Sequence, residues 1–431
     1  MINLYPHQQE ALEQTKGFEN VAIYHDMGLG KTFTGSEVLK RYGCKVNLVG
    51  CQKSKIRDWL NHFHEYYSSW FVYDLTNKSE LKEFITNMND PQGIMIGVIN
   101  YDMIWRRKEL INTHDFTLML DESSLIQNPR SKRTKFILKM NPSHVVLLSG
   151  TPVGGKYENL WSQLHLLGWN ISERLYNRQY INWKTITIGG MTHKIVDRDN
   201  PYKNIDRLKL KMREYGAVFK KTDEVMDLPE QVFTTIKVKP TREYFRFMKN
   251  YIIDVEDVEG DELVGDTTLT RLLYSRQLCA HYNENKLEAF KDLLESTRDR
   301  LIVFYTWNEE LERLKNICEE LERPVSQVNG HVKDLTAFEN EDDAICICQY
   351  QSASKGLNLQ EYGCNKMIYF SLPLSSEDFE QSKKRIHRIG QEKTCFYYLM
   401  ICEDSVEEKI LKRLKERKDY TDALFEEDEC K

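Results

Sequence analysis

Short apolar runs alternate with amphipathic stretches along this sequence, and this alternation leaves the chain few folds to adopt. In the first part of the chain the stretch from 32 to 42 has a helical pattern and ends at Gly43, a residue type that favours helix C-termini. Between such stretches lie runs long enough for one buried strand each, at 21–24, 46–50, 94–99, 116–120 and 144–148. Strands that alternate with helices predict a parallel sheet covered by helices.

The same alternation returns late in the chain. Apolar runs lie at 301–306, 344–350, 366–371 and 395–401, and a helical stretch is expected at 308–322. The middle differs, because the stretch KTITIGGMTHKI (184–195) alternates around two glycines, which predicts a β-hairpin. The acidic, glycine-bearing stretch 254–266 predicts an exposed loop, and the charged C-terminus after Asp404 predicts one amphipathic helix. The sequence therefore predicts two α/β lobes, 1–165 and 286–431, with a small α+β insertion and linker helices at 166–285 that partly complete the first lobe.

Composition excludes several classes of protein. The chain has 431 residues, 41% of them hydrophobic and 29% charged, and a net charge of −6, as expected for a soluble protein of two or three domains. No apolar run approaches the roughly 20 residues of a membrane span, and the ten cysteines form no CxxC pair. We expect a cytoplasmic protein with reduced thiols and no zinc site. Taken alone, the three basic clusters indicate only solvated faces: Lys53, Lys55 and Arg57; Arg106, Arg107 and Lys108; Lys132, Arg133 and Lys135.

The stretch YHDMGLGKT follows the first predicted strand and precedes the first predicted helix, which is the setting of a phosphate-binding loop. Gly28 and Gly30 allow backbone N–H groups to turn toward phosphate oxygens. Lys31 would pair with the β- and γ-phosphates, and the hydroxyl of Thr32 would bind Mg²⁺. His25 stands where the usual pattern has its first glycine. The alternative is a plain glycine turn before a helix.

An acidic pair, Asp121 and Glu122, follows the run at 116–120. A carboxylate at the end of a neighbouring strand is placed to bind the Mg²⁺ of the loop, and its neighbour can orient or deprotonate the attacking water. The alternative is an acidic pair that caps the next helix. Ser149 and Thr151 follow the next strand and are expected at the same crevice, although Ser-Gly-Thr-Pro is also ordinary turn chemistry.

A pair of arginines lies in the late part of the chain. Arg385 and Arg388 are three residues apart, which predicts one face of a helix, and Gln381 lies one turn before them. A rigid, always charged guanidinium suits contact with the γ-phosphate. A solvated basic helix is an equally good interpretation of these residues alone.

Together the motifs resemble those of the superfamily 2 helicases, and more narrowly the Swi2/Snf2-like ATPases. The resemblance covers nearly the whole chain in family order, and it rests on LYPHQQEAL, DMGLGKT, DESSLIQNPRSKRTK, LSGTP, TDEVMDLPEQ, SASKGLNLQ and QSKKRIHRIGQ. Three departures stand out: His25 and Asp26 replace an acidic pair, Ser124 replaces a histidine thought to couple ATP state to the second lobe, and 324–343 is short.

The resemblance implies two RecA-like lobes that bind ATP and Mg²⁺ and hydrolyse ATP. Catalytic roles fall on Lys31, Asp121, Glu122, Arg385 and Arg388, and Thr32 and Asp121 hold the metal. Nucleotide contacts fall on Gln8, Met27, Gly28, Leu29, Gly30, Lys31, Thr32, Gly356 and Gln381. DNA contacts fall on Lys53, Ser54, Asn100, Tyr101, Thr306, Trp307, Ser354, Lys355 and Asn358.

From this resemblance we expect an ATP-dependent motor on double-stranded or branched DNA, independent of base sequence. It is expected to remodel forks or branched DNA in phage replication or recombination, as a monomer in the bacterial host cytoplasm, with replication or recombination proteins as partners. The resemblance also suggests a compact motor without chromatin-reading domains. The alternatives are a strand-separating DNA or RNA helicase and a non-catalytic nucleic-acid-binding scaffold.

Overall fold

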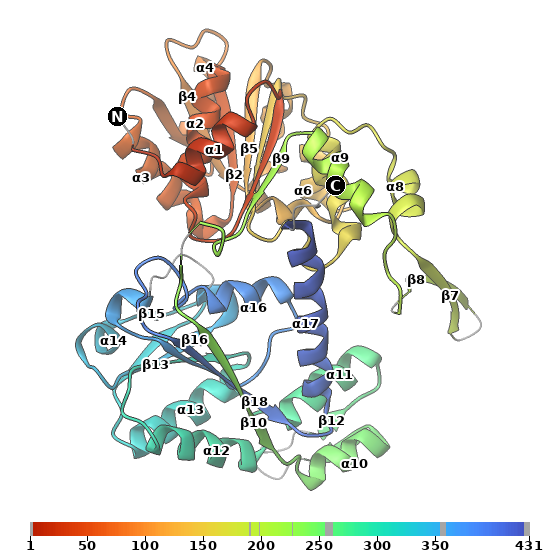
Figure 1. The fold of residues 1–431 in the computed structure, drawn as a ribbon, viewed down its shortest axis with the longest axis vertical. Coiled ribbons are helices and arrows are strands. Elements are labelled where there is room, and N and C mark those ends of the chain that lie inside the picture. The colour runs from red at the N-terminus through yellow and green to blue at the C-terminus, as the bar shows by residue number, and fades with distance from the viewer. Residues whose placement is uncertain are drawn as a thin grey trace. The chain divides into compact units, whose positions relative to one another are not determined.

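The computed structural model describes residues 3–188, 191–197, 199–225, 227–254, 262–353 and 359–425 (Figure 1). The chain divides into two compact units, one of residues 1–226 with 419–431 and the other of residues 227–418. Within the described residues each unit contains a seven-stranded sheet. The predicted α/β class with two parallel-sheet domains is confirmed.

The sheet of the first unit has the order β3-β4-β2-β5-β6-β1-β9, and its described pairings are all parallel. Its strands are β1 (Asn20–His25), β2 (Val46–Cys51), β3 (Phe71–Asp74), β4 (Met95–Asn100), β5 (Phe116–Asp121), β6 (His144–Leu148) and β9 (Ala217–Lys220). Its helices are α1 (Pro6–Gln14), α2 (Lys31–Tyr42), α3 (Ile56–Tyr66), α4 (Lys78–Asn87), α5 (Tyr101–Ile104), α6 (Lys132–Ile137), α7 (Trp161–Leu166), α8 (Glu173–Tyr180) and α9 (Ile205–Glu214).

Both faces of this sheet are buried, which explains the unbroken apolar runs in the sequence. Successive strand residues point to opposite faces, so Val146 joins the cluster under α2 and α3, whereas Leu147 joins the cluster under α4 to α9. Because parallel strands share one direction, their carboxyl ends meet at one edge of the sheet. The phosphate-loop residues and the acidic pair both follow strands at that edge.

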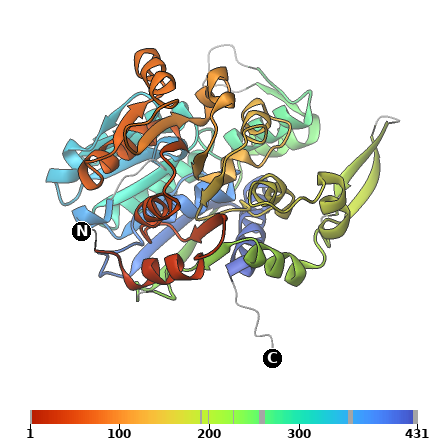
Figure 2. The ribbon, with the colours of Figure 1, turned by 90° about the horizontal axis from the view of Figure 1, so that it is seen from above.

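The predicted β-hairpin is present in the first unit. Strands β7 (Trp183–Ile188) and β8 (Met191–Val196) pair in antiparallel register, from Trp183 with Val196 to Ile188 with Met191. The two glycines at its tip, 189 and 190, lie outside the described residues. Figure 2 shows the hairpin extending away from α8 and α9, the helices that flank it in the chain.

The sheet of the second unit has the order β10-β18-β17-β13-β16-β14-β15, parallel except for the pair β14 and β15. Its strands are β10 (Gln231–Val238), β13 (Leu301–Tyr305), β14 (Val325–Val328), β15 (Lys333–Asp334), β16 (Ile345–Gln349), β17 (Lys366–Tyr369) and β18 (Cys395–Cys402). Its helices are α10 (Arg242–Asn250), α11 (Thr268–Leu278), α12 (Glu284–Glu295), α13 (Asn308–Glu320), α14 (Thr336–Asn340), α15 (Tyr350–Ala353) and α16 (Ser376–Lys383), and α17 (Val406–Phe425) begins in it.

The segment 166–285, expected between the lobes, is divided between the two compact units. Helix α9 and strand β9 complete the first unit, whereas β10 pairs along its whole length with β18 of the second. In the acidic stretch, the strands β11 (Ile252–Asp254) and β12 (Glu262–Val264) pair in antiparallel register, and residues 255–261 lie outside the described ones.

A buried ion pair joins α12 to the start of α17 in the second unit. Nζ of Lys286 lies 2.7 and 2.9 Å from the two carboxylate oxygens of Glu407, and both side chains are almost fully buried. The carboxylate also accepts the backbone N–H of Cys402 at 2.8 Å. Burial raises the pKa of Glu407, and the charge of Lys286 opposes that rise. The pair is therefore satisfied as long as both partners are present.

Within the described ranges, no helix combines the length and the apolar character that a membrane crossing requires.

Candidate nucleotide site

The loop between β1 and α2 has the backbone of a phosphate-binding loop. Gly28 and Gly30 have φ of +90° and +70°, in the left-handed region that favours glycine, and α2 begins directly after Gly30. Leu29 between them is buried and anchors the loop. The ammonium of Lys31 donates to the carbonyl oxygens of His25 at 2.8 Å and Asp26 at 3.0 Å. The lysine therefore lies against the start of the loop, and its contact with phosphates stays a prediction.

Helix α1 holds this loop from the outside. The carboxamide of Gln8 donates to the carbonyl of Gly30 at 3.0 Å and accepts the N–H of Tyr5 at 2.8 Å, and His7 lies 2.9 Å from the carbonyl of Leu29. A Cβ on Gly30 would come within 2.2 Å of the Gln8 amide nitrogen. Gln8 was predicted to contact adenine, and the structure places its buried side chain on the backbone of the loop.

A second support comes from the residues after β9. Both the N–H and the hydroxyl of Thr222 donate to one carboxylate oxygen of Asp26, at 3.2 and 3.0 Å, and the N–H of Asp26 donates to the carbonyl of Lys220. The motif analysis did not predict a role for Thr222. The sequence did contain a sign of such a role, because Thr222 is the first residue of the motif TDEVMDLPEQ.

Asp121 and Glu122 lie at the carboxyl end of β5, as predicted. The indole N–H of Trp59 donates to the carboxylate of Asp121 at 2.9 Å, and Glu122 has a left-handed φ of +56°. Burial raises the pKa of both carboxyl groups, that of Glu122 to about 7. The positive charge of Lys31 opposes both shifts, so these three side chains interact electrostatically.

A buried amide connects the acidic pair to the SGTP turn. Oε1 of Gln163, on α7, accepts the hydroxyls of Ser123 at 2.7 Å and Tyr24 at 3.0 Å, and its Nε2 donates to the carbonyl of Pro152 at 2.7 Å. Gln163 is fully buried. One side chain thus joins β1, the residue after the acidic pair, and the loop after β6. Sequence reasoning missed it, because a lone glutamine in an apolar helix carries no motif.

These residues fit ATP with Mg²⁺. The glycines give the loop the backbone that phosphate cradling requires, and Lys31 supplies a cation. A hydroxyl from Thr32 and a carboxylate from Asp121 are hard oxygen ligands of the kind that Mg²⁺ prefers. Oε1 of Glu122 is buried without a hydrogen-bond partner among the described atoms, as suits a group that acts on water.

The arginine pair is placed differently from the prediction. Helix α16 ends at Lys383, so Arg385 and Arg388 lie in the turns that follow and not on one helical face. Two tertiary contacts hold these turns: Tyr397 donates to the carbonyl of Lys383 at 3.1 Å, and His387 lies 2.9 Å from the carbonyl of Pro229.

Within the second unit, the side chains of Gln381, Arg385 and Arg388 differ in how far they are exposed to solvent. Arg385 and Gln381 are buried, and the amide of Gln381 donates to Glu377 at 3.2 Å. Arg388 is half-buried, and this burial lowers its pKa from the usual value, with Glu361 opposing the shift. The two arginines therefore lie in a turn that a hydrogen bond from β18 holds in place.

The predicted DNA contacts fall into different environments. Lys53 and Ser54 are exposed in the short 3-10 helix that follows β2, as a phosphate contact requires. Asn100 and Tyr101, on which DNA contacts were also predicted, have buried side chains. The hydroxyl of Tyr101 donates instead to the carbonyl of Asp121 at 2.8 Å, so this tyrosine supports the acidic pair.

In the second unit, Thr306 and Trp307 are half-buried at the end of β13. Their N–H groups donate to the buried carboxylate of Glu310, at 2.6 and 3.1 Å, and the hydroxyl of Thr306 accepts from Ser371. These contacts hold the start of α13. The predicted residues Ser354, Lys355, Gly356 and Asn358 lie outside the described residues.

Comparison with known families gives two adjacent matches. Residues 7–284 match the SNF2-related domain, and residues 285–390 match the helicase conserved C-terminal domain. The two matches confirm the resemblance that the motifs indicated. They meet near the predicted start of the second lobe, whereas the compact units divide earlier, after residue 226.

Known relatives match over nearly the whole chain. A SWI/SNF-related matrix-associated actin-dependent regulator of chromatin subfamily A-like protein 1 from Xenopus laevis is 22% identical over 96% of this chain and 43% of its own length. The DNA repair and recombination protein RAD54-like from Danio rerio is 20% identical over 99% of this chain and 68% of its own. The chain spans less than half of the first relative. A solved Sulfolobus solfataricus SWI2/SNF2 ATPase core in complex with dsDNA aligns with a TM-score of 0.45 and 19% identity, covering 98% of this chain and 92% of that one.

Proposed function

Since the chain belongs to the family of the SNF2-related domain, we propose that it is an ATP-hydrolysing motor that moves along DNA and remodels forks or branched DNA. One observation carries the proposal: the glycine-shaped loop with Lys31 and the acidic pair Asp121 and Glu122 follow two strands of one parallel sheet, β1 and β5, at the same edge of that sheet. This is the set of groups that phosphoryl transfer to water needs.

In the proposed reaction, the loop backbone and Lys31 bind the phosphates of ATP. Thr32 and Asp121 hold Mg²⁺, which neutralises charge on the phosphate oxygens when bound. Glu122, deprotonated above its pKa of about 7, accepts a proton from the attacking water. Water attacks the terminal phosphorus, the bond to the bridging oxygen breaks, and ADP and phosphate leave.

In the proposal, the turn of the second unit that contains Arg385 and Arg388 assists the hydrolysis of ATP. Arg385 and Arg388 would stabilise negative charge on the terminal phosphate, because a guanidinium stays charged and presents a rigid fork of donors. Removal of such an arginine costs on the order of 10³-fold in turnover. Linking hydrolysis to a change between the two units would convert each turnover into movement on DNA.

DNA binding in the proposal relies on phosphate contacts, so it is independent of base sequence and weakens with salt. Lys53 and Ser54 supply one exposed contact site. The names of the relatives, a regulator of chromatin and a DNA repair and recombination protein, favour DNA over RNA as the track.

The test measures ATP turnover alone and with duplex, branched and single-stranded DNA and with RNA. We expect stimulation by duplex or branched DNA. Lys31→Ala should lose turnover by at least about 10³-fold, whereas Lys40→Ala, an exposed lysine further along the same helix, should keep it. Turnover in Lys31→Ala, or no stimulation by any DNA, would refute the proposal. A strand-displacement assay separates a translocase from a strand-separating helicase.

A further inference from the structure

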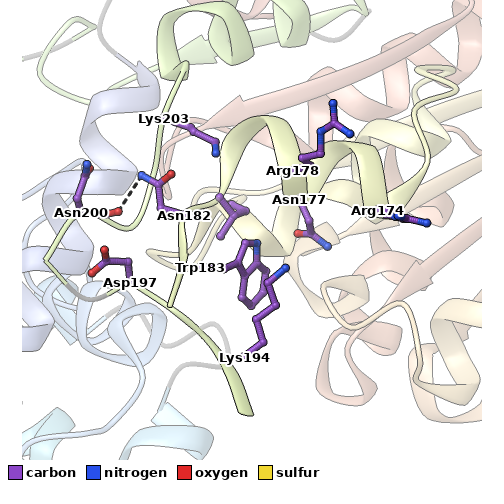
Figure 3. A pocket seen from close by; sticks show the side chains of 10 residues that line it. Arg174, Asn177, Arg178, Asn182, Trp183, Lys194, Asp197, Asn200 and Lys203 are labelled. Carbon is purple, nitrogen blue, oxygen red and sulfur yellow. Dashed lines mark hydrogen bonds between the residues drawn. The ribbon is translucent and has the colours of Figure 1, made fainter. Parts of the chain in front are cut away.

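The first unit contains a pocket of about 820 Å³ beside its β-hairpin. The residues that line it come from a different part of the sequence than the loops of the nucleotide site. The pocket lies between α8, the base of the hairpin and the segment that follows β8 (Figure 3). Its lining is polar and basic around one indole ring: Arg174, Asn177, Arg178, Ile181, Asn182, Trp183, Lys194, Asp197, Asn200 and Lys203. A pocket of this size lies in the range of about 300–1,000 Å³ that ligand sites occupy.

Backbone pairing makes the pocket wall rigid. Ile181 forms an isolated antiparallel bridge with Tyr202, and the N–H of Lys203 donates to the carbonyl of Tyr180 at 3.0 Å. The side chain of Asn182 donates to the carbonyl of Asn200 at 2.9 Å, the bond drawn in Figure 3. The segments before and after the hairpin are therefore tied together, and the lining residues are held at fixed places.

The pocket carries a local positive charge in a chain whose net charge is −6. Residues 173–214 contain ten lysines and arginines against five aspartates and glutamates. In the described part of the chain, no carboxylate pairs with Arg174, Arg178 or Lys203. The acidic residue of the lining, Asp197, is neutralised by Lys184 at 2.7 Å. Unpaired cations along one wall favour an anion.

The arginines are arranged to follow a chain of phosphates. Arg174 and Arg178 are four residues apart on α8, so they lie on one face of the helix, and both are exposed. Figure 3 shows them on one side of the pocket, with Lys203 and the amides of Asn182 and Asn200 toward the other. Charges on both sides of a cavity match a ligand with more than one phosphate group.

Trp183 gives the pocket a flat apolar surface. Its ring is half-buried against the core of the unit, and Nζ of Lys194 lies 5.5 Å from the ring centre. An aromatic platform beside cations is the combination by which proteins bind unpaired bases without regard to sequence. Bases inside a duplex are stacked on each other and present no free face to an indole.

We propose that this pocket binds a single-stranded segment of DNA, with one base on Trp183 and the flanking phosphates on Arg174, Arg178 and Lys203. The inference builds on the proposed function, because a motor on branched DNA meets unpaired strands at the branch point. The hairpin would then mark where a displaced strand is held, apart from the contacts on the duplex.

The test compares Arg174→Gln/Arg178→Gln with the wild type by fluorescence anisotropy of a labelled oligo(dT) strand over a series of salt concentrations. Loss of two phosphate contacts should weaken binding and reduce the slope of log K against log salt by about 1.4. Trp183→Leu should weaken binding by about tenfold, with a smaller change in slope. A melting curve of each variant shows that it is folded.

The matched control is Lys78→Gln/Lys82→Gln, which removes two exposed cations with the same spacing from α4. It should keep the wild-type slope. Equal slopes for the two double variants would overturn the inference, and so would free dTMP binding as tightly as the oligonucleotide. Duplex-stimulated ATP turnover should stay unchanged in Arg174→Gln/Arg178→Gln. If no DNA stimulates the wild type, the proposed function fails, while the anisotropy result still decides whether the pocket binds a strand.

Discussion

Gln163 offers the sharpest test of how the nucleotide site of this protein is built. Its amide makes three hydrogen bonds, to the hydroxyls of Tyr24 and Ser123 and to the carbonyl of Pro152, and all four residues are buried. Gln163→Leu keeps a similar volume and helix propensity but removes every one of these bonds. Any loss of stability therefore reports on the polar network and not on a cavity.

The expected loss can be worked out from the groups that are left behind. Each buried polar group without a partner costs about 1–3 kcal/mol, and Gln163→Leu leaves three such groups. We therefore expect the free energy of unfolding of the first unit to fall by about 3–5 kcal/mol. For a unit of this size that corresponds to a drop in Tm of about 6–20 °C. Tyr24→Phe should cost only about 1 kcal/mol, because Oε1 of Gln163 still accepts from Ser123.

The assay is scanning calorimetry of the full chain, in which each variant is compared with the wild type. A double-mutant cycle gives the decisive number: in the Gln163→Leu background, Tyr24→Phe removes a hydroxyl that is already unpaired and should cost nothing. The coupling energy should therefore be about 1 kcal/mol. A Tm for Gln163→Leu within about 2 °C of the wild type, or additive effects in the double variant, would refute the role of this amide.

Two further predictions concern the buried charges. Because burial raises the pKa of Glu122 to about 7, turnover should rise with pH through about 7 and fall about tenfold per unit below it, in a pH–rate profile at saturating ATP. The folded pKa exceeds the unfolded value, so ionising Glu122 destabilises the fold as pH rises from about 4.5 to about 7; Glu122→Gln should therefore lose turnover, keep ATP binding and melt higher at about pH 8. A flat profile would contradict this. In the second unit, Lys286→Met leaves Glu407 buried without its cation and should cost about 3–5 kcal/mol by calorimetry. The exposed Lys291→Met on the same helix should cost under about 1 kcal/mol, and equal losses would contradict the buried pair's role.

The sequence predicted the central strands well because both faces of each sheet are buried. Such strands appear as unbroken apolar runs, and all nine predicted runs contain a strand. Strands β3 and β10 were among those missed. In β10 five of the eight residues are exposed and no apolar run marks the strand, whereas β3 lies in a short apolar run at 70–73 that the sequence prediction left out. Because β10 belongs to the second sheet, the compact units divide after residue 226, inside the segment 166–285 that was expected between the lobes.

Individual side chains were harder to predict than motifs, because a motif fixes the backbone position and not what the side chain contacts. Tyr101 follows a strand at the expected edge, yet its hydroxyl turns inward to the carbonyl of Asp121. Arg385 and Arg388 have helical spacing, but the helix ends at Lys383, and a hydrogen bond from Tyr397 of β18 to the carbonyl of Lys383 holds the turn that carries them. Both side-chain environments include tertiary hydrogen bonds, which local periodicity cannot reveal.

Backbone geometry explains why the loop can have His25 where the usual pattern has its first glycine. His25 is the last residue of β1 and pairs with Lys220 of β9, so its backbone is extended and any residue type is allowed there. The loop needs left-handed backbone only at Gly28 and Gly30, and both glycines are retained. Burial, followed by the charge of Lys31, lowers the pKa of His25 to about 3, so its ring is neutral at physiological pH. A neutral ring leaves Lys31 as the charge that the phosphates meet, and the backbone carbonyl of His25 serves the lysine as that of a glycine would.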